Sequence, residues 1–339
     1  MSSVGESQKI PFAIGSWNGA ILPGLGLTFG IALVATAAQR LSGIPALSPL
    51  VVAMVLGIAL RNLAGTPAAA QPGIGFTLRR VLRFAIVLLG FQLTLEQLRA
   101  VGVPGLAVIS VTLAATFVFT KWAGRLLGVE TRLAELIAAG TSVCGASAVI
   151  ATNTVTRGSD EDVAYAIACV TVFGSLSMIA MPVLGEMLAM APAHYGIWVG
   201  ATIHEVAQVV GAGFQHGAEA GQAATVAKLS RVMLLAPLIL VLGAMARRGG
   251  KDAHGAAPTP WFVLGFIGVV LINSVFPLPE ALHGEVVGLT SFLLTMALAA
   301  MGLETNIRKL RAKGIRPLAL GALAWLFISA LGLGLVGLI

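Results

Sequence analysis

The chain has 339 residues, of which 57% are hydrophobic and only 10% are charged. A soluble domain carries about 25% charged residues, so the composition excludes an ordinary water-soluble protein and predicts an all-α, polytopic membrane protein. The formal charge of +7 could indicate a nucleic-acid partner, but no RNA- or DNA-binding motif accompanies it. The two cysteines, Cys144 and Cys169, lie in apolar segments, which excludes a disulfide framework and a cysteine-based zinc site.

Apolar windows predict the membrane spans. A helix that crosses a bilayer needs about 20 mostly apolar residues. We expect a cytoplasmic N-terminal tail at 1–17 and a single transmembrane domain at 18–338. No cleavage site follows the polar start, so the first apolar run is expected to be retained as a span. About eleven spans are predicted in chain order, near 18–38, 46–63, 79–97, 101–121, 133–152, 163–190, 195–215, 225–246, 260–277, 286–304 and 316–338.

The positive charges predict the orientation. With the N-terminus inside, all but five of the 21 lysines and arginines lie on the cytoplasmic side. Cytoplasmic loops are enriched in these residues, so we expect a cell inner (plasma) membrane protein with a cytoplasmic N-terminus and an external C-terminus. The basic charge then reflects topology rather than nucleic-acid binding. The five exceptions are Arg40, Arg99, Arg157, Lys228 and Arg231.

Two stretches recur along the chain. "PLVVAMVLGIALRN" (49–62) matches "PWFVLGFIGVVLIN" (260–273), and "GFQLTLEQLRAVGVPGL" (90–106) matches "GLETNIRKLRAKGIRPL" (302–318). Spans two to four therefore resemble spans nine to eleven, and a separation of seven spans would give the copies opposite directions. Inverted repeats are typical of secondary transporters, which bind substrate near the midplane between the halves. Chance similarity between Leu/Gly-rich helices is the alternative.

Span five contains "GTSVCGASAVIATNT" (140–154), which is rich in glycine and small hydroxylated residues. Such residues can simply allow helices to pack closely. They can also form a broken helix whose freed backbone groups and hydroxyls bind substrate. The motif alone favours neither interpretation.

Span seven contains "ATIHEVAQVVGAG" (201–213). Ionisable residues within a membrane are costly and usually functional. A continuous helix would place His204 and Gln208 on one face, with Glu205 about 100° away. A hydrogen-bonded packing histidine is the alternative. The motif begins like the H-E-x-x-H helix of zinc proteases, but Gln208 stands at the second histidine's position, so an intramembrane zinc hydrolase is a remote alternative.

Two basic residues lie in "VAKLSRVMLLAP" (226–237). Lys228 and Arg231 are expected at the outer start of span eight, where they could attract an anion. Snorkelling of their long side chains to the interface is the alternative.

Five segments together resemble the bacterial putative sulfate exporter family: "GTSVCGASAVIA", the acidic "RGSDED", "YAIACVTVFGSLSMIAMPVLG", "GIWVGATIHEVAQVVGAG" and "VAKLSRVMLLAP". The resemblance implies a multi-pass transporter whose fold is similar to the cation/proton antiporter and bile acid symporter group. In that group, a panel of helices flanks a core with two unwound, crossing helices. Residues 133–246 would form the core, and the repeat-related spans would form the panel. The crossovers would comprise Thr141, Ser142, Cys144, Gly145 and Ser147, and then His204, Glu205 and Gln208.

The expected function is secondary-active transport of a small anion, such as sulfate or an organosulfonate, by alternating access. Substrate binding is assigned to the first crossover and Gln208, and ion coupling to His204 and Glu205. The alternative is a Na⁺- or H⁺-coupled symporter of a small organic acid. We expect no enzymatic activity, no metal and no cofactor beyond a coupling ion, and no ATP-binding motif is present. The apolar panel faces would suit a homodimer.

Overall fold

The computed structural model describes residues 19–42, 48–96, 102–248, 261–307 and 313–339, and all regular elements in these ranges are helices. The predicted tail at 1–17 lies outside them. In the described part of the chain, two shorter apolar helices, Pro49–Leu63 and Trp261–Val275, accompany six helices that are long and apolar enough to cross a membrane. The prediction of an all-α, multi-pass membrane protein is confirmed. The six long helices are Gly19–Leu41, Gly102–Leu126, Asp160–Met187, Ala218–Met245, Leu282–Glu304 and Ile315–Val336.

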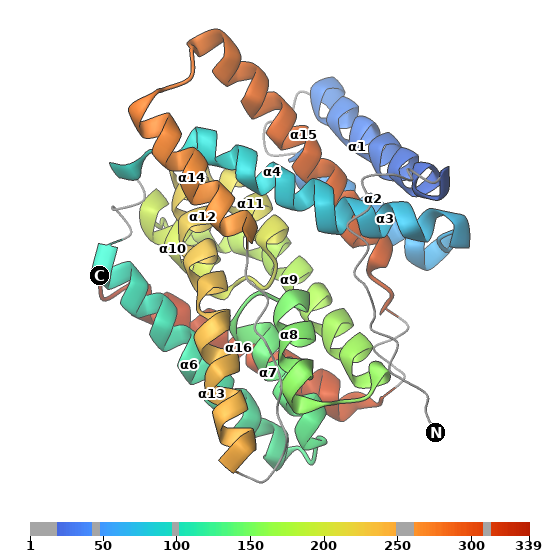
Figure 1. Cartoon of the computed structure of the whole chain (residues 1–339), viewed down its shortest axis with the longest axis vertical. Coiled ribbons are helices and arrows are strands. Elements are labelled where there is room, and N and C mark those ends of the chain that lie inside the picture. Colours follow the sequence, from blue (N-terminus) through green and yellow to red (C-terminus); the bar gives the residue numbers. More distant parts are fainter. Residues whose placement is uncertain (1–18, 43–47, 97–101, 249–260, 308–312) are drawn as a thin grey trace, which may run out of the picture.

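One group of helices lies along the upper side of Figure 1. It consists of α1 (Leu22–Ser42), α2 (Pro49–Leu63), α3 (Gln71–Phe76), α4 (Leu82–Leu89), α14 (Trp261–Val275) and α15 (Glu280–Glu304). A π-helical turn, Thr77–Val81, joins α3 to α4, and the short η4 (Gly90–Gln92) follows. Glycines allow close backbone contact in this group: a Cβ at Gly57 of α2 would lie 2.5 Å from the carbonyl oxygen of Ala299 in α15.

The second group occupies the middle and lower part of Figure 1. It consists of α6 (Gly102–Leu126), α7 (Thr131–Ser142), α8 (Ala146–Thr156), α9 (Asp160–Met187), α10 (Pro192–Thr202), α11 (Val206–Gln215), α12 (Ala218–Met233), α13 (Leu235–Arg248) and α16 (Ile315–Val336). Short gaps of three residues separate α7 from α8 and α10 from α11.

Two asparagines make equivalent contacts within the first group. Asn62, at the end of α2, donates through Nδ2 to the carbonyl oxygen of Thr305, just after α15, at 2.9 Å. Asn273, in the last turn of α14, donates through Nδ2 to the carbonyl oxygen of Leu93, just after η4, at 3.1 Å. Asn62 and Asn273 are the aligned ends of the first repeated stretch, and Thr305 and Leu93 are aligned in the second.

The two groups share one hydrophobic cluster. It contains Met54 and Leu298 from the first group and Met178 and Val210 from the second. A polar contact also crosses between them, because Gln222 of α12 donates to a carbonyl oxygen of η4 at 2.9 Å. The broken helices of the second group are thereby held beside the first group.

The third, eighth and tenth predicted windows begin several residues too late, the tenth at 286 although α15 begins at Glu280. The third was expected at 79–97, but the helix begins with α3 at Gln71, so Arg79 and Arg80 lie within it rather than before it. The eighth was expected at 225–246, but α12 begins at Ala218. Arginines in the third window and the weakly apolar "AEAGQAA" (218–224) lowered the hydropathy on which the third and eighth windows depended.

Candidate functional site

The first helix break lies between α7 and α8. The helix ends at Ser142, and Val143 follows with φ −117° and ψ −87°. Gly145 then adopts φ 68° before α8 begins at Ala146. A Cβ at Gly145 would lie 2.5 Å from Cδ of Glu205 and still closer to Oε1. Glycine is therefore required both for the left-handed backbone and for the approach of the glutamate.

The second break lies between α10 and α11. Ile203, His204 and Glu205 are not helical, and α11 begins at Val206 with Glu205 as its N-cap. The prediction that His204 and Gln208 share one helical face is therefore wrong. Instead, Gln208 Oε1 accepts a hydrogen bond from the backbone N–H of Glu205 at 3.1 Å, as in a capping box.

Lys228 of α12 connects the two breaks. Its side chain is fully buried. Its Nζ donates to the carbonyl oxygen of Val143, in the first break, and to that of Ile203, in the second, both at 2.8 Å. The last carbonyl groups of a helix lack partners within the helix and carry partial negative charge. The ammonium group therefore stabilises the C-terminal ends of α7 and α10 together.

Arg231, one turn further along α12, is also fully buried. Its Nε donates to the carbonyl oxygen of Ser142 at 2.7 Å, and one terminal nitrogen donates to that of Ile203 at 3.0 Å. The other terminal nitrogen donates to the carbonyl oxygen of Thr141. Both side chains are buried inside the protein, so the snorkelling alternative is wrong, and both residues lie well inside α12 rather than at its start. The error arose because span eight was predicted to begin at residue 225, whereas α12 begins at Ala218.

Glu205 lies at the helix N-termini of the two breaks, whereas the α12 cations bind the carbonyl groups at the C-terminal ends. Its Oε1 accepts a hydrogen bond at 2.5 Å from the backbone N–H of Ala146, the first residue of α8. A helix N-terminus carries partial positive charge and attracts anions. One carboxylate thus lies at the N-termini of both α8 and α11, while the two α12 cations lie at the C-termini of α7 and α10.

Gln208 connects α11 to α9. It is fully buried, and its Nε2 donates to the carbonyl oxygen of Thr171 at 3.1 Å and to Oγ of Ser175 at 3.2 Å. A Cβ at Gly174 would collide with its amide group. The amide therefore fits against a glycine-lined stretch of α9.

Replacing Gln208 with alanine should lower the free energy of unfolding by about 1–3 kcal/mol, because buried hydrogen-bonding groups lose their partner. Thermal unfolding of the purified protein in detergent measures this change. Thr225→Val is a suitable control, because Thr225 is equally buried and bonds only within its own helix, to Gly221. Equal melting temperatures of Gln208→Ala and the wild-type protein would contradict the stabilising role assigned to the Gln208 hydrogen bonds.

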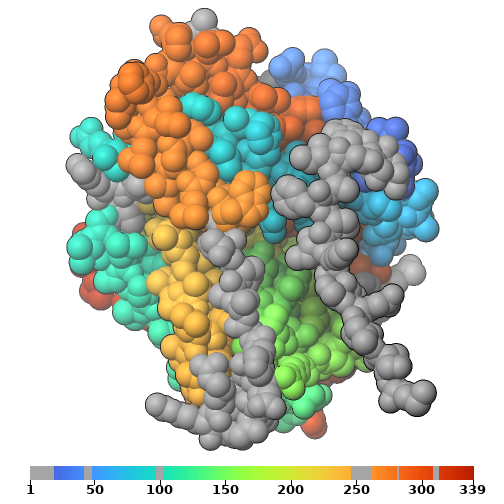
Figure 2. Space-filling model, viewed as in Figure 1, coloured from blue at the N-terminus to red at the C-terminus, as the bar shows by residue number. Residues whose placement is uncertain are grey.

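The remaining predicted residues differ in accessibility. Thr141, Ser142, Cys144 and His204 are buried, and Nδ1 of His204 has no hydrogen-bond partner. Ser147, by contrast, is exposed, and Glu205 is partly exposed. Figure 2 shows green residues of the α8–α9 region at the surface of the molecule. Ser147 is therefore the most exposed of the predicted site residues.

The structure brings all eight predicted crossover residues and both α12 cations into one region. The backbone groups that complete it were missed by the sequence analysis: the N–H of Ala146 and the carbonyl groups of Val143 and Ile203. Backbone groups carry no residue-type signal, so only the helix breaks could have indicated them. Among the described residues, no three His, Cys, Asp or Glu side chains are grouped as metal ligands.

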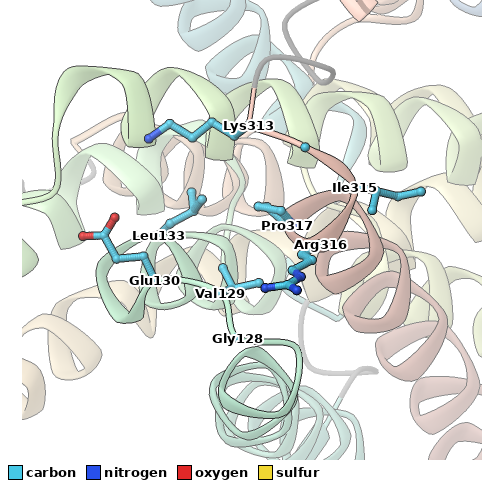
Figure 3. A pocket seen from close by; sticks show the side chains of 9 residues that line it. Gly128, Val129, Glu130, Leu133, Lys313, Ile315, Arg316 and Pro317 are labelled. Carbon is cyan, nitrogen blue, oxygen red and sulfur yellow. The ribbon is translucent and has the colours of Figure 1, made fainter.

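A separate hollow of about 410 Å³ lies where the loop after α6 meets the start of α16 (Figure 3). Its lining includes Glu130, Lys313 and Arg316. Lys313 is paired with Asp162 of α9, and this hydrogen bond raises the pKa of Lys313. The lining of the hollow carries charges of both signs. The hollow is therefore a weaker candidate for an anion-binding site than the helix breaks.

Comparison with known proteins agrees with this architecture. A family model described as "Conserved hypothetical protein 698" matches residues 23–321. A UPF0324 membrane protein of Bordetella pertussis is 40% identical over 321 residues, covering 89% of this chain and 92% of the relative. A UPF0324 membrane protein of Pseudomonas aeruginosa is 40% identical over 327 residues, covering 91% and 92%.

A third relative, the UPF0324 inner membrane protein YeiH of Salmonella typhi, is 38% identical over 322 residues and covers 91% and 92%. The predicted resemblance to the putative sulfate exporter family is consistent with these matches. The chain therefore belongs to the family described as conserved hypothetical protein 698, the UPF0324 membrane proteins.

Proposed function

We propose that this protein is a secondary-active transporter that carries a small anion, such as sulfate or an organosulfonate, across the inner membrane by alternating access. The observation that carries the proposal is the pair of fully buried cations, Lys228 and Arg231, at the meeting point of two broken helices. Burying a charged side chain within a membrane costs free energy, and such residues usually have a functional role. Two cations and one carboxylate leave an excess of positive charge that suits an anion.

The helix arrangement also supports transport. Within the described residues there are six long and two short apolar helices. If the pairs α3–α4, α7–α8 and α10–α11 each cross the membrane as one span, the total is the proposed eleven. The equivalent contacts of Asn62 and Asn273 favour an inverted repeat, in which spans two to four and nine to eleven would form the panel. In such transporters one helix group moves against the other. We infer a cytoplasmic N-terminus and an external C-terminus.

Within this proposal, the substrate is bound by Thr141, Ser142, Cys144, Gly145, Ser147 and Gln208, and coupling is carried by His204 and Glu205. Ser147 and the N-terminus of α8 are the accessible part of the site. The α12 cations attract the anion, and their hydrogen bonds to carbonyl oxygens stabilise the non-helical breaks. We infer no enzymatic activity.

A H⁺- or Na⁺-coupled symporter of a small organic acid is the second candidate, because a carboxylate lies among the buried cations. Both candidates predict that an ion gradient drives uptake into proteoliposomes. Radiolabelled sulfate, methanesulfonate and acetate should each be tested with pH and Na⁺ gradients varied separately. The anion that is accumulated identifies the substrate class, and the gradient that drives it identifies the coupling ion.

In the same assay, Glu205→Gln should remove the pH dependence of uptake. Glu219→Gln provides the matched control, since Glu219 is an exposed carboxylate at the start of α12 and should leave the pH profile unchanged. Failure of the wild-type protein to accumulate any of the anions would refute the proposal. Stoichiometric zinc in the purified protein, with loss of activity on chelation, would instead favour the hydrolase.

A further inference from the structure

The N-terminus of α8 is already occupied by a negative group of the protein itself. Glu205 Oε1 lies 2.5 Å from the N–H of Ala146. Exposed N–H groups at the start of a helix bind anions such as sulfate and carboxylate. The side chain of Glu205 therefore fills the position that an oxyanion would take.

The charges around Glu205 make this position favourable for an anion in general. Lys228 faces it from α12, the thiol of Cys144 faces it from the first break, and His204 precedes it in the chain, while Arg231 lies beside Cys144. Helix α9 contributes only neutral groups, through Gln208. If Glu205 were neutral and nothing replaced it, two buried cations would remain without an anion, which is costly.

Two further observations indicate an incoming ligand. Nδ1 of His204 is buried without a hydrogen-bond partner, although buried polar atoms are normally paired. Ser147 is exposed and Glu205 is partly exposed, whereas the α12 cations are fully buried. Ser147 and the Glu205 carboxylate therefore form the more exposed part of the site, and the cations lie deeper in the protein.

We propose that Glu205 and the transported anion compete for the N-terminus of α8, so that the anion binds there only after Glu205 takes up a proton. The carboxylate gains one proton from solution and releases the N–H of Ala146, and an oxygen of the anion accepts that hydrogen bond. When the anion leaves, Glu205 loses the proton and returns. One proton accompanies each anion, and this rests on the anion transport proposed above.

The competition can be measured in the purified full-length protein in detergent. Sulfate is titrated at a series of pH values, its affinity is taken from the rise in melting temperature, and proton uptake is followed with a pH indicator in weak buffer. Where Glu205 is ionised, the wild-type protein should lose about tenfold in sulfate affinity for each unit of rising pH, because one proton is bound with the anion. About one proton should be taken up per sulfate.

Two variants remove the competing charge. Glu205→Gln keeps an oxygen that can accept from Ala146 but has no charge, and Glu205→Ala removes the group. Both should bind sulfate with an affinity that does not change with pH, and neither should take up a proton. At neutral pH both should bind at least as tightly as wild type. The proton count in the wild-type protein serves as a test that needs no variant, should either one fold poorly.

The outcomes separate this inference from the proposed function. Sulfate binding to the wild-type protein without proton uptake, or weaker binding by Glu205→Gln at every pH, would overturn the competition and leave anion transport intact. If neither the wild type nor the variants bind sulfate, methanesulfonate or acetate at any pH, both proposals fail.

Discussion

Replacing Arg231 with methionine should lower the free energy of unfolding by about 3 kcal/mol, because carbonyl groups at both helix breaks lose a buried donor. Arginine donates to Thr141, Ser142 and Ile203 at once. Methionine has a similar length and no donor, and the loss of the buried charge offsets only part of the cost. The change is measured by thermal unfolding of the purified protein in detergent.

Two further variants make this measurement specific. Arg40→Met changes an exposed arginine at the end of α1 and should alter stability by less than about 0.5 kcal/mol. Arg231→Lys keeps the charge but cannot reproduce the planar, three-way donation, so its stability should lie between wild type and Arg231→Met. If Arg231→Met unfolds at the same temperature as Arg40→Met, the arginine does not hold the breaks together.

Gly145→Ala should have the second large effect, on both stability and transport. A sparsely populated backbone conformation costs a residue with a Cβ about 1–3 kcal/mol, and Gly145 has φ 68° with ψ −130°. The new methyl group would also displace Glu205 from Ala146. Loss of a hydrogen bond to a charged group costs a further 1.5–3 kcal/mol or so. We expect no measurable sulfate uptake and a clearly lower melting temperature.

Gly65→Ala is the matched control. Gly65 also has a left-handed φ, of 81°, but a Cβ there meets no atom within 4 Å. This variant should show the backbone cost alone and keep its transport activity. Equal effects of the two substitutions would mean that the contact between Gly145 and Glu205 has no energetic importance.

The sequence predicts the first helix break better than the second. Two glycines and several hydroxylated residues within 140–147 indicate a poor helix. The residues of the second break, Ile203, His204 and Glu205, include neither glycine nor proline. Lys228 and Arg231 hold this break from α12, about 25 residues away. A tertiary contact of this kind has no local pattern, which is why a continuous helix was expected at 195–215.

The hydropathy windows fail for a related reason. They treat each segment as if lipid surrounded it, so a lysine or arginine is assigned to a span end. Within a bundle, Lys228 and Arg231 obtain their partners from other helices, and α12 can carry both within its length. The membrane class depends on total composition rather than on partners, so it is predicted correctly.

The buried cations of α12 also set a condition on how the chain is made. A lysine or arginine at the centre of a helix costs about 2.5–3.5 kcal/mol when that helix enters the bilayer alone. Their carbonyl partners belong to α7 and α10, which are synthesised earlier. Helix α12 should therefore enter the membrane against the broken helices, which are already in place. A chain released before residue 231 should leave the carbonyl groups at the ends of α7 and α10 without these partners, and we expect it to be degraded.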